Sequence, residues 1–222
     1  MELYFLIVAT VLILLILFII SSSSYKYDNT KKSGTKGNKY GGVSRDEAEI
    51  KAAGQQGEQY ASGLIEKILQ PTDNLFQNVE MTFEGKETEL DNVIVNKYGV
   101  FIVEVKNYVG KIVGEEDDFE WIKYKTKEPY NTYEKHIKNP IKQVKRQIYI
   151  LSKCLKRENI SVWVKGYAML VNNNSPVENE CVIEDISKLD KIIHTQDRKI
   201  LSEKEIEKIC NLLNIAQNCC FR

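Results

Sequence analysis

The sequence predicts an α/β domain, a mixed β-sheet with helices packed against it, preceded by one transmembrane helix. Segments with apolar residues at helical spacing are separated by shorter runs rich in Val, Ile, Phe and Tyr, which are typical of strands. An uncharged apolar run of 18 residues stands near the N-terminus. Beyond it and the polar segment that follows, roughly 180 residues remain, enough for one domain with a hydrophobic core.

The apolar run, residues 3–20, has the length of a transmembrane helix. At about 1.5 Å per residue it would extend about 27 Å, close to the thickness of the hydrocarbon core. A cleaved signal peptide is the alternative, but no positive charge precedes the run and the run is longer than usual for such a peptide. Basic residues dominate the segment after it. Because basic flanks stay in the cytoplasm, we expect a single-pass topology with the N-terminus outside and the C-terminal domain in the cytoplasm.

Residues 21–43 are rich in Ser, Gly, Lys and Asn and lack hydrophobic periodicity, so they predict a flexible linker before a domain at 44–222. The 31 basic residues balance the 31 acidic ones, which excludes a uniformly basic nucleic-acid coat protein. Two histidines and no Cys-x-x-Cys motif argue against a zinc site. The five cysteines, including the Cys219-Cys220 pair, fit reduced thiols better than a disulfide framework.

Three helices are expected, at residues 44–69, from Asn139-Pro140 to about 155, and at 202–216. The first and last begin with a Ser-x-x-Glu capping box, and the middle one has proline in its first turn. Three glycines inside the first helix (Gly54, Gly57, Gly63) each weaken it by about 1 kcal/mol relative to alanine. Glycine is favoured there if another backbone must come close.

Strand-like runs occupy residues 75–83, 89–96 and 100–107, then 162–171 and 182–183, with further candidates at 111–113 and 119–124. The sequence Asn96-Lys-Tyr-Gly99 is a turn signal that joins the second and third runs into a hairpin. Trp121 and Trp163 are expected in the core.

This hairpin brings charged residues together. Side chains alternate along a strand, so Glu104 and Lys106 share one face. With the turn closed by Asn96 and Gly99, paired residue numbers sum to 195, which places Asp91 directly across from Glu104. Like charges directly opposed destabilise a sheet, and charged groups are seldom buried without a partner. A bound cation would remove the conflict, and carboxylate ligands favour Mg²⁺ or Mn²⁺.

A metal held by two carboxylates can bind a phosphate oxygen and activate a water molecule, while the Lys106 ammonium orients the water or the phosphate. The alternative is an amphipathic hairpin whose Asp, Glu and Lys side chains form ordinary surface pairs. Glu-x-Lys alone is common, so the opposed Asp91 carries most of the argument.

Several blocks of sequence, in order, resemble the nuclease-related domain (NERD) family of the PD-(D/E)xK nuclease superfamily. They are Gly54-Gln-Gln-Gly57-Glu58, Glu89-Leu-Asp91-Asn-Val-Ile-Val95, Gly99-Val-Phe-Ile-Val-Glu104-Val-Lys106-Asn107-Tyr108, Gly110-Lys-Ile-Val-Gly114, Trp121 and Asn139-Pro140-Ile141-Lys142-Gln143. The resemblance covers about residues 50–170 and implies a restriction-endonuclease-like core. Leu90 departs from it, since the superfamily's name has proline at this place.

The resemblance also implies site residues. It gives metal ligands at Asp91, Glu104 and the Val105 carbonyl, a catalytic Lys106, a contribution from Glu58 on the first helix, and Gln143 at the border of the site. A solvated helix carboxylate is the alternative for Glu58, and structural hydrogen bonding is the alternative for Gln143. His136 and His194 are expected at the surface rather than as metal ligands.

Residues 123–157 hold 11 Lys and Arg against two acidic residues, a net charge of +9, with four tyrosines interleaved. This pattern is typical of a surface that binds a phosphate backbone, and we expect Lys142, Lys145 and Arg146 to contribute. A solvated basic helix face is the alternative. The neighbouring acidic run, residues 115–118, is expected to be a solvated loop tip.

Together these observations predict a membrane-anchored, Mg²⁺- or Mn²⁺-dependent nuclease whose partner is nucleic acid, expected to be DNA. One alternative has the same fold without catalysis and holds nucleic acid at the membrane. Another is a tethered protein-interaction module in which the charged hairpin is surface decoration. The complete set of Asp91, Glu104 and Lys106 favours the enzyme.

Overall fold

The computed structural model describes residues 45–127, 131–173 and 176–219, all within the unit Val43–Arg222. The predicted transmembrane helix at 3–20 and linker at 21–43 lie outside the described residues. Among the helices that are described, none is both long enough and apolar enough to span a bilayer.

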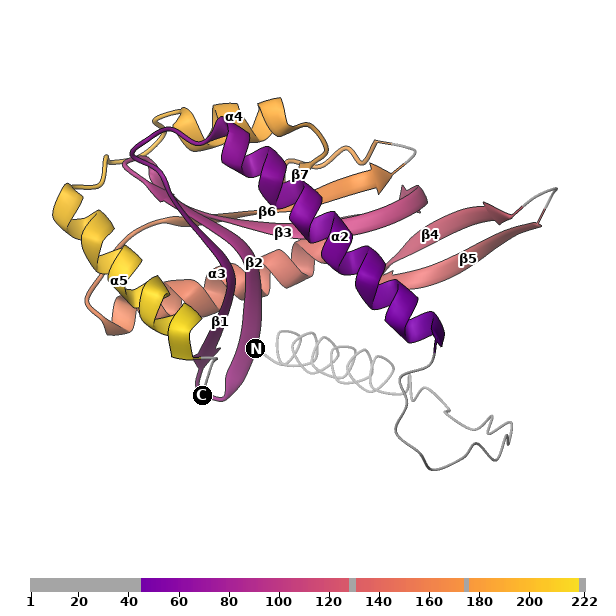
Figure 1. Cartoon of the computed structure of the whole chain (residues 1–222), viewed down its shortest axis with the longest axis horizontal. Coiled ribbons are helices and arrows are strands. Elements are labelled where there is room, and N and C mark those ends of the chain that lie inside the picture. Colours follow the sequence, from indigo (N-terminus) through magenta and orange to yellow (C-terminus); the bar gives the residue numbers. More distant parts are fainter. Residues whose placement is uncertain (1–44, 128–130, 174–175, 220–222) are drawn as a thin grey trace, which may run out of the picture. The chain divides into compact units, whose positions relative to one another are not determined.

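The described residues form a seven-stranded sheet with helices on both faces (Figure 1). The strands are β1 (Asn74–Phe83), β2 (Lys86–Asn96), β3 (Gly99–Val113), β4 (Glu120–Lys127), β5 (Asn131–Lys138), β6 (Val164–Asn173) and β7 (Val182–Ile183). The helices are α2 (Arg45–Ile68), α3 (Pro140–Arg157), α4 (Ile186–His194) and α5 (Glu203–Cys219). The prediction of a mixed α/β fold is confirmed.

Strand β3 is the centre of the sheet. It pairs with β2 in antiparallel fashion and with β6 in parallel fashion, and its C-terminal end pairs with β4, which continues into β5. The β2–β3 register runs from Asn96↔Gly99 to Asn92↔Val103. Every pair sums to 195, so the predicted register is confirmed over this stretch.

Alternation of side chains along β2 and β3 gives both faces of the sheet an apolar cover. On one face, Val93 and Ile102 pack in a cluster with residues of α3 and α5. On the other face, Ile94 and Phe101 pack in a cluster with residues of α2 and α4. A third cluster joins Trp121 at the base of β4 to the first turn of α3. The central strands are therefore buried on both sides, as in a layered α/β protein.

Helix α2 crosses the sheet at Gly57. A Cβ atom added there would lie 2.5 Å from Cβ of Asn107 on β3, whereas Gly54 and Gly63 have open space around the same position. The expected reason for glycine in this helix therefore holds at Gly57 alone. The close approach places the N-terminal half of α2 beside the β3 residues that follow Lys106.

Several predictions need correction. Trp163 is 61% exposed, because it lies just before β6 begins, and the Arg198 guanidinium stacks on its ring at 4.8 Å. Trp121 is buried as expected. Strand β5 and helix α4 were not predicted, and the candidate strand at 111–113 is the end of a single long β3.

Candidate active site

Strands β2 and β3 separate where the predicted acidic residues stand. Their last Cα pair is Asn92↔Val103, after which β3 goes on to pair with β4. At the separation the Val105 N–H donates a hydrogen bond to Oδ2 of Asp91 at 2.7 Å. We call this opening, bounded by Asp91, Glu104, Val105 and Lys106, the fork. At the fork the backbone N–H and C=O groups of β2 and β3 no longer form the regular hydrogen bonds of the β2–β3 ladder.

Glu104 is buried in the fork, with 1% of its surface exposed. Its Oε1 accepts hydrogen bonds from Nζ of Lys106 and Nε2 of Gln143, and its Oε2 accepts one from Nε2 of Gln147. A buried carboxylate is costly unless it is paired and hydrogen-bonded, and these three donors meet that need. Gln143 is therefore in direct contact with Glu104.

Gln147 is a site residue that sequence reasoning missed. It is fully buried, and besides Glu104 it donates to the backbone oxygen of Glu89 at 2.8 Å. Its own Oε1 has no hydrogen-bond partner in the described structure. The available signal was its spacing, one helical turn after Gln143, which puts both amides on one side of α3.

The two charged neighbours of Glu104 have shifted pKa values. Burial raises the pKa of Asp91 to about 7, and the charge of Glu104 adds to this, while the Val105 hydrogen bond and Lys106 oppose it. Burial lowers the pKa of Lys106, but the charge and hydrogen bond of Glu104 outweigh burial and leave that pKa raised. The fork thus keeps a cation at Lys106 and resists a second negative charge at Asp91.

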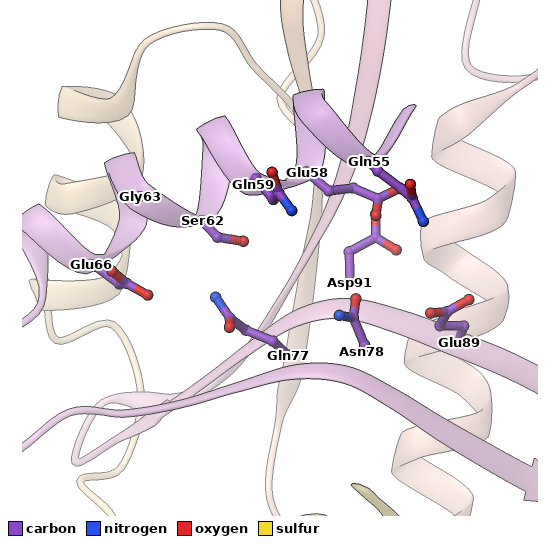
Figure 2. Close-up of a pocket in the computed structure, with 10 residues that line it drawn as sticks. All are labelled: Gln55, Glu58, Gln59, Ser62, Gly63, Glu66, Gln77, Asn78, Glu89 and Asp91. Atoms are coloured by element: carbon purple, nitrogen blue, oxygen red, sulfur yellow. The ribbon is translucent and has the colours of Figure 1, made fainter. Parts of the chain in front are cut away.

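A cleft of about 560 Å³ opens between α2 and strands β1 and β2 (Figure 2). Its lining is polar and includes four acidic residues: Glu58, Glu66, Glu89 and Asp91. Figure 2 shows the carboxylates of Glu58 and Asp91 pointing toward one another. The charge of Glu58 also raises the pKa of Asp91 and, after burial, that of Glu89. The structure therefore brings Glu58 to the fork from the α2 side.

The residues of the fork fit a hard divalent cation. Mg²⁺ usually binds to one or two carboxylates and keeps several waters or phosphate oxygens. Asp91 and Glu104 supply two carboxylates, although the described residues contain no group of three or more His, Cys, Asp or Glu side chains that could hold a metal. Because N–H and C=O of a strand residue point to the same neighbour, the Val105 carbonyl also faces the fork. The raised pKa of Asp91 is what a site short of positive charge would show.

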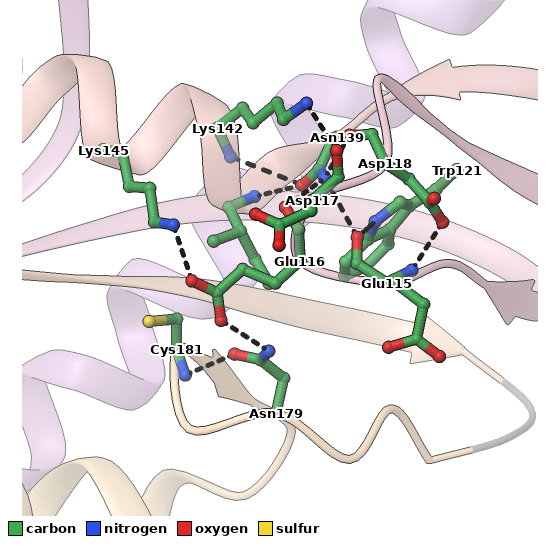
Figure 3. A network of polar contacts seen from close by, with 11 residues as sticks. Glu115, Glu116, Asp117, Asp118, Trp121, Asn139, Lys142, Lys145, Asn179 and Cys181 are labelled. Atoms are coloured by element: carbon green, nitrogen blue, oxygen red, sulfur yellow. Dashed lines mark hydrogen bonds and ion pairs between the residues drawn. The ribbon is translucent and has the colours of Figure 1, made fainter. Parts of the chain in front are cut away.

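The acidic run at 115–118 is exposed at Glu115, Asp117 and Asp118, as expected of a solvated loop tip, and its backbone is also held on the start of α3 (Figure 3). Nδ2 of Asn139, the N-cap of α3, donates to the backbone oxygens of Glu115, Glu116 and Asp118 at 3.2, 3.1 and 2.8 Å. Its Oδ1 accepts from the backbone N–H groups of Ile141 and Lys142, so one side chain binds both segments. The loop thereby fixes the first turn of α3.

The three basic residues predicted to bind nucleic acid have partners within the chain. Nζ of Lys142 donates a hydrogen bond to the backbone oxygen of Asp117 at 2.8 Å. Nζ of Lys145 forms an ion pair with the carboxylate of Glu116 at 2.6 Å. Nη2 of Arg146 donates a hydrogen bond to the backbone oxygen of Glu87 at 2.9 Å. Their role toward nucleic acid stays a prediction.

The histidines lie away from the fork. His136 is exposed on β5, and its Nδ1 lies 3.3 Å from Oε2 of Glu120 on β4. His194, at the end of α4, lies between two aspartates: Nδ1 is 2.6 Å from Asp190 and Nε2 is 2.9 Å from Asp73. Burial lowers the pKa of His194, but the bonds and charges of the two aspartates outweigh burial and leave it raised. This cluster ties α4 to the start of β1.

Comparison with known proteins gives a family match over the segment that holds this site. The family described as nuclease-related domain (NERD) matches residues 53–171, a segment that contains all of the fork together with Glu58, Gln143 and Gln147. An uncharacterized protein of Bacillus anthracis is 28% identical over 170 residues, which cover 70% of this chain and 80% of that protein. No solved structure matches the chain. Since the family match spans more than half of the sequence, the chain belongs to the nuclease-related domain family.

Proposed function

We propose that this protein is a metal-dependent nuclease that hydrolyses phosphodiester bonds of nucleic acid, with DNA as the substrate. The observation that carries the proposal is the meeting of Asp91, Glu104 and Lys106 at the fork, inside a nuclease-related domain. Two carboxylates and an ammonium on diverging strands are the groups that metal-assisted phosphoryl chemistry requires, and one of the carboxylates, Asp91, lines the cleft.

Each residue would have a distinct task. Asp91, Glu104 and the Val105 carbonyl would hold Mg²⁺ or Mn²⁺, which when bound stabilises charge on the phosphate and lowers the pKa of a water. The Lys106 ammonium would hold the scissile phosphate or the attacking water. Gln147 would keep Glu104 in place through Oε2, while Glu58 would add a further carboxylate from α2.

A second candidate function has a specific observation in its favour. Both oxygens of Glu104 already accept hydrogen bonds from Lys106, Gln143 and Gln147, so the buried carboxylate is satisfied without a cation. A domain of this kind without turnover would still bind nucleic acid. Cleavage by the wild type separates the two functions.

We further propose that residues 3–20 anchor the protein in a membrane, with the nuclease-related domain on the cytoplasmic side. The support is the uncharged run of 18 residues and the basic segment after it. Fractionation of cells that express the full chain, with protease protection of tags at either end, tests both the anchor and its orientation. Recovery of the whole chain in the soluble fraction would contradict the anchor.

The nuclease proposal is tested with the full chain in non-ionic detergent, incubated with labelled DNA or RNA and with Mg²⁺, Mn²⁺ or EDTA. We expect cleavage of DNA that needs the metal and is lost in Lys106→Ala. Lys165→Ala is a matched control, because Lys165 is also a part-buried, ion-paired lysine on a central strand, with 18% of its side chain exposed against 21% for Lys106. Binding of nucleic acid without cleavage in the presence of either metal would favour the second candidate function, a domain that binds nucleic acid without catalysis.

A further inference from the structure

The β4–β5 hairpin, here called the ribbon, extends beyond the helices at the end of β3 (Figure 1). Each strand has eight residues, so at about 3.4 Å per residue the ribbon is about 27 Å long. Its base is fixed, because Trp121 and Ile137 pair across the two strands and belong to the cluster with Ile112 and Ile141. Beyond this base the same face of the ribbon has no apolar cover from a helix.

Charge is separated between the two faces of the ribbon. Directly paired residues share a face, so Trp121 and Ile137 are followed outward by Lys123 opposite Lys135 and Lys125 opposite Tyr133. The acidic residues Glu120 and Glu134 fall on the other face by the same alternation. Within the described part of the ribbon, the face that continues from the core is therefore basic and free of acidic residues.

The lysines of this face are held close together, and no acidic residue of the described part of the ribbon shares the face with them. Lys123 and Lys135 form a direct cross-strand pair, an arrangement of like charges that destabilises a sheet. Burial and the charges of Lys125 and Lys135 lower the pKa of Lys123. Among the residues that the structure describes, none of the three lysines forms an ion pair. A polyanion on this face would supply the negative charge that the described residues do not.

This basic face continues into the fork. Glu104 and Lys106 share one face of β3 by alternation. The strand is irregular between Asn107 and Gly110, but Tyr108 and Ile112 pack in one cluster with Leu170, the β6 partner of Lys106, and Ile112 pairs with Lys123 of β4. Nζ of Lys123 lies 5.3 Å from the centre of the Tyr108 ring, two residues from Lys106. A row of positive charge thus runs from the ribbon, past Tyr108, to the Lys106 ammonium.

Resting on the proposed function, we propose that the basic face of the ribbon, formed by Lys123, Lys125 and Lys135, binds the phosphate backbone of double-stranded DNA and leads it to the fork. A two-stranded ribbon matches the width of the major groove of B-DNA, and DNA presents a phosphate about every 3.4 Å along each strand. The basic residues of α3 are less suited, because Lys142, Lys145 and Arg146 already have partners within the chain.

The test measures binding of the full chain to a fluorescent DNA duplex in EDTA, over salt concentrations from about 0.05 to 0.3 M. The variant Lys123→Gln/Lys125→Gln/Lys135→Gln should bind roughly 10²-fold more weakly at about 0.1 M salt, with a salt slope smaller by about two to three. The triple arginine variant at the same positions should bind like the wild type. So should Lys191→Gln/Lys204→Gln/Lys208→Gln, which removes the same charge from exposed positions on α4 and α5.

Three results would overturn the inference. An unchanged affinity and salt slope in the ribbon variant, with the wild type binding DNA, would reject the ribbon and leave the nuclease proposal standing. Tighter wild-type binding to single-stranded DNA or to an RNA duplex would reject the choice of partner. A wild type that binds no nucleic acid would reject both proposals. Circular dichroism and urea unfolding of each variant show that lost binding is not lost folding.

Discussion

Replacing Asp91 by asparagine should stabilise the metal-free protein at neutral and alkaline pH. Asparagine keeps an oxygen that accepts the Val105 hydrogen bond, but it removes the charge that burial and Glu104 disfavour. The pKa of Asp91 is about 7 in the folded protein against an ordinary value of 3.8. Between these values the folded state binds a proton that the unfolded state releases, so the stability of the wild type falls as pH rises.

The size of the effect follows from the pKa difference. One pH unit corresponds to about 1.4 kcal/mol, so a difference of about three units gives an upper limit of about 4 kcal/mol. Asp91 borders the open cleft and keeps some contact with water, so we expect about 2–4 kcal/mol above pH 7. Below about pH 3 the carboxyl is protonated in both states, and the pH-dependent difference between wild type and variant should vanish.

Urea unfolding at a series of pH values in EDTA, followed by tryptophan fluorescence, measures this difference. The control is Glu207→Gln, which removes an exposed carboxylate from α5, and its difference from wild type should not change over the same range. Parallel pH profiles for the wild type and Asp91→Asn would refute the reasoning. Millimolar Mg²⁺ or Mn²⁺ should stabilise the wild type and not Asp91→Asn, because a ligand that binds the folded state alone raises the free energy of unfolding.

Two further predictions concern residues packed around the fork, and a third concerns the ion pairs of His194. Gly57→Ala should destabilise the protein by about 1–3 kcal/mol because its Cβ meets β3, whereas Gly54→Ala should stabilise it by up to about 1 kcal/mol; thermal melts compare them. Gln147→Leu should cost about 1–3 kcal/mol in urea unfolding, because Glu104 and the Glu89 carbonyl lose a buried donor. The His194 ion pairs should stabilise fully below about pH 6.5 and lose their effect as pH rises through the raised folded pKa, and His194→Gln should remove this loss from the unfolding profile.

The parts of the fold that were predicted are those with local signals. The capping box at Ser202 has the expected reciprocal bonds with Glu205, and Asn139 caps α3. The β2–β3 register followed from a short turn and a period of two. Strand β5 gave no such signal, since its sequence NTYEKHIK is largely polar and becomes a strand through pairing with β4. Helix α4 is short, with only two buried residues to mark its apolar side.

The site divides in the same way. Alternation and register bring Asp91 near Glu104 and Lys106, because the hairpin joins them locally. The predicted direct pair of Asp91 with Glu104 is absent from the described register, which ends at Asn92↔Val103, and Asp91 accepts a hydrogen bond from Val105 instead. Glu58 and Gln143 were reached only through the family resemblance, since α2 and α3 meet the fork through tertiary packing. Gln147 was missed because its value lies in a contact with Glu104, 43 positions earlier in the chain. The spacing of residues within α3 cannot indicate a partner that lies on β3.

The hydrogen bonds that hold Glu104 connect the fork to α3 and, through α3, to the acidic loop at 115–118. Two of the three donors to Glu104, Gln143 and Gln147, stand one turn apart on α3, so the carboxylate follows any shift of that helix. The first turn of α3 is fixed in turn by Asn139, which binds the helix with its oxygen and the loop at 115–118 with its nitrogen. The loop therefore positions a proposed metal ligand without touching it. This accounts for acidic residues next to a site that already has excess negative charge. Three of their backbone oxygens bind Asn139, the fourth binds Lys142, and Glu116 has Lys145 as its counter-charge.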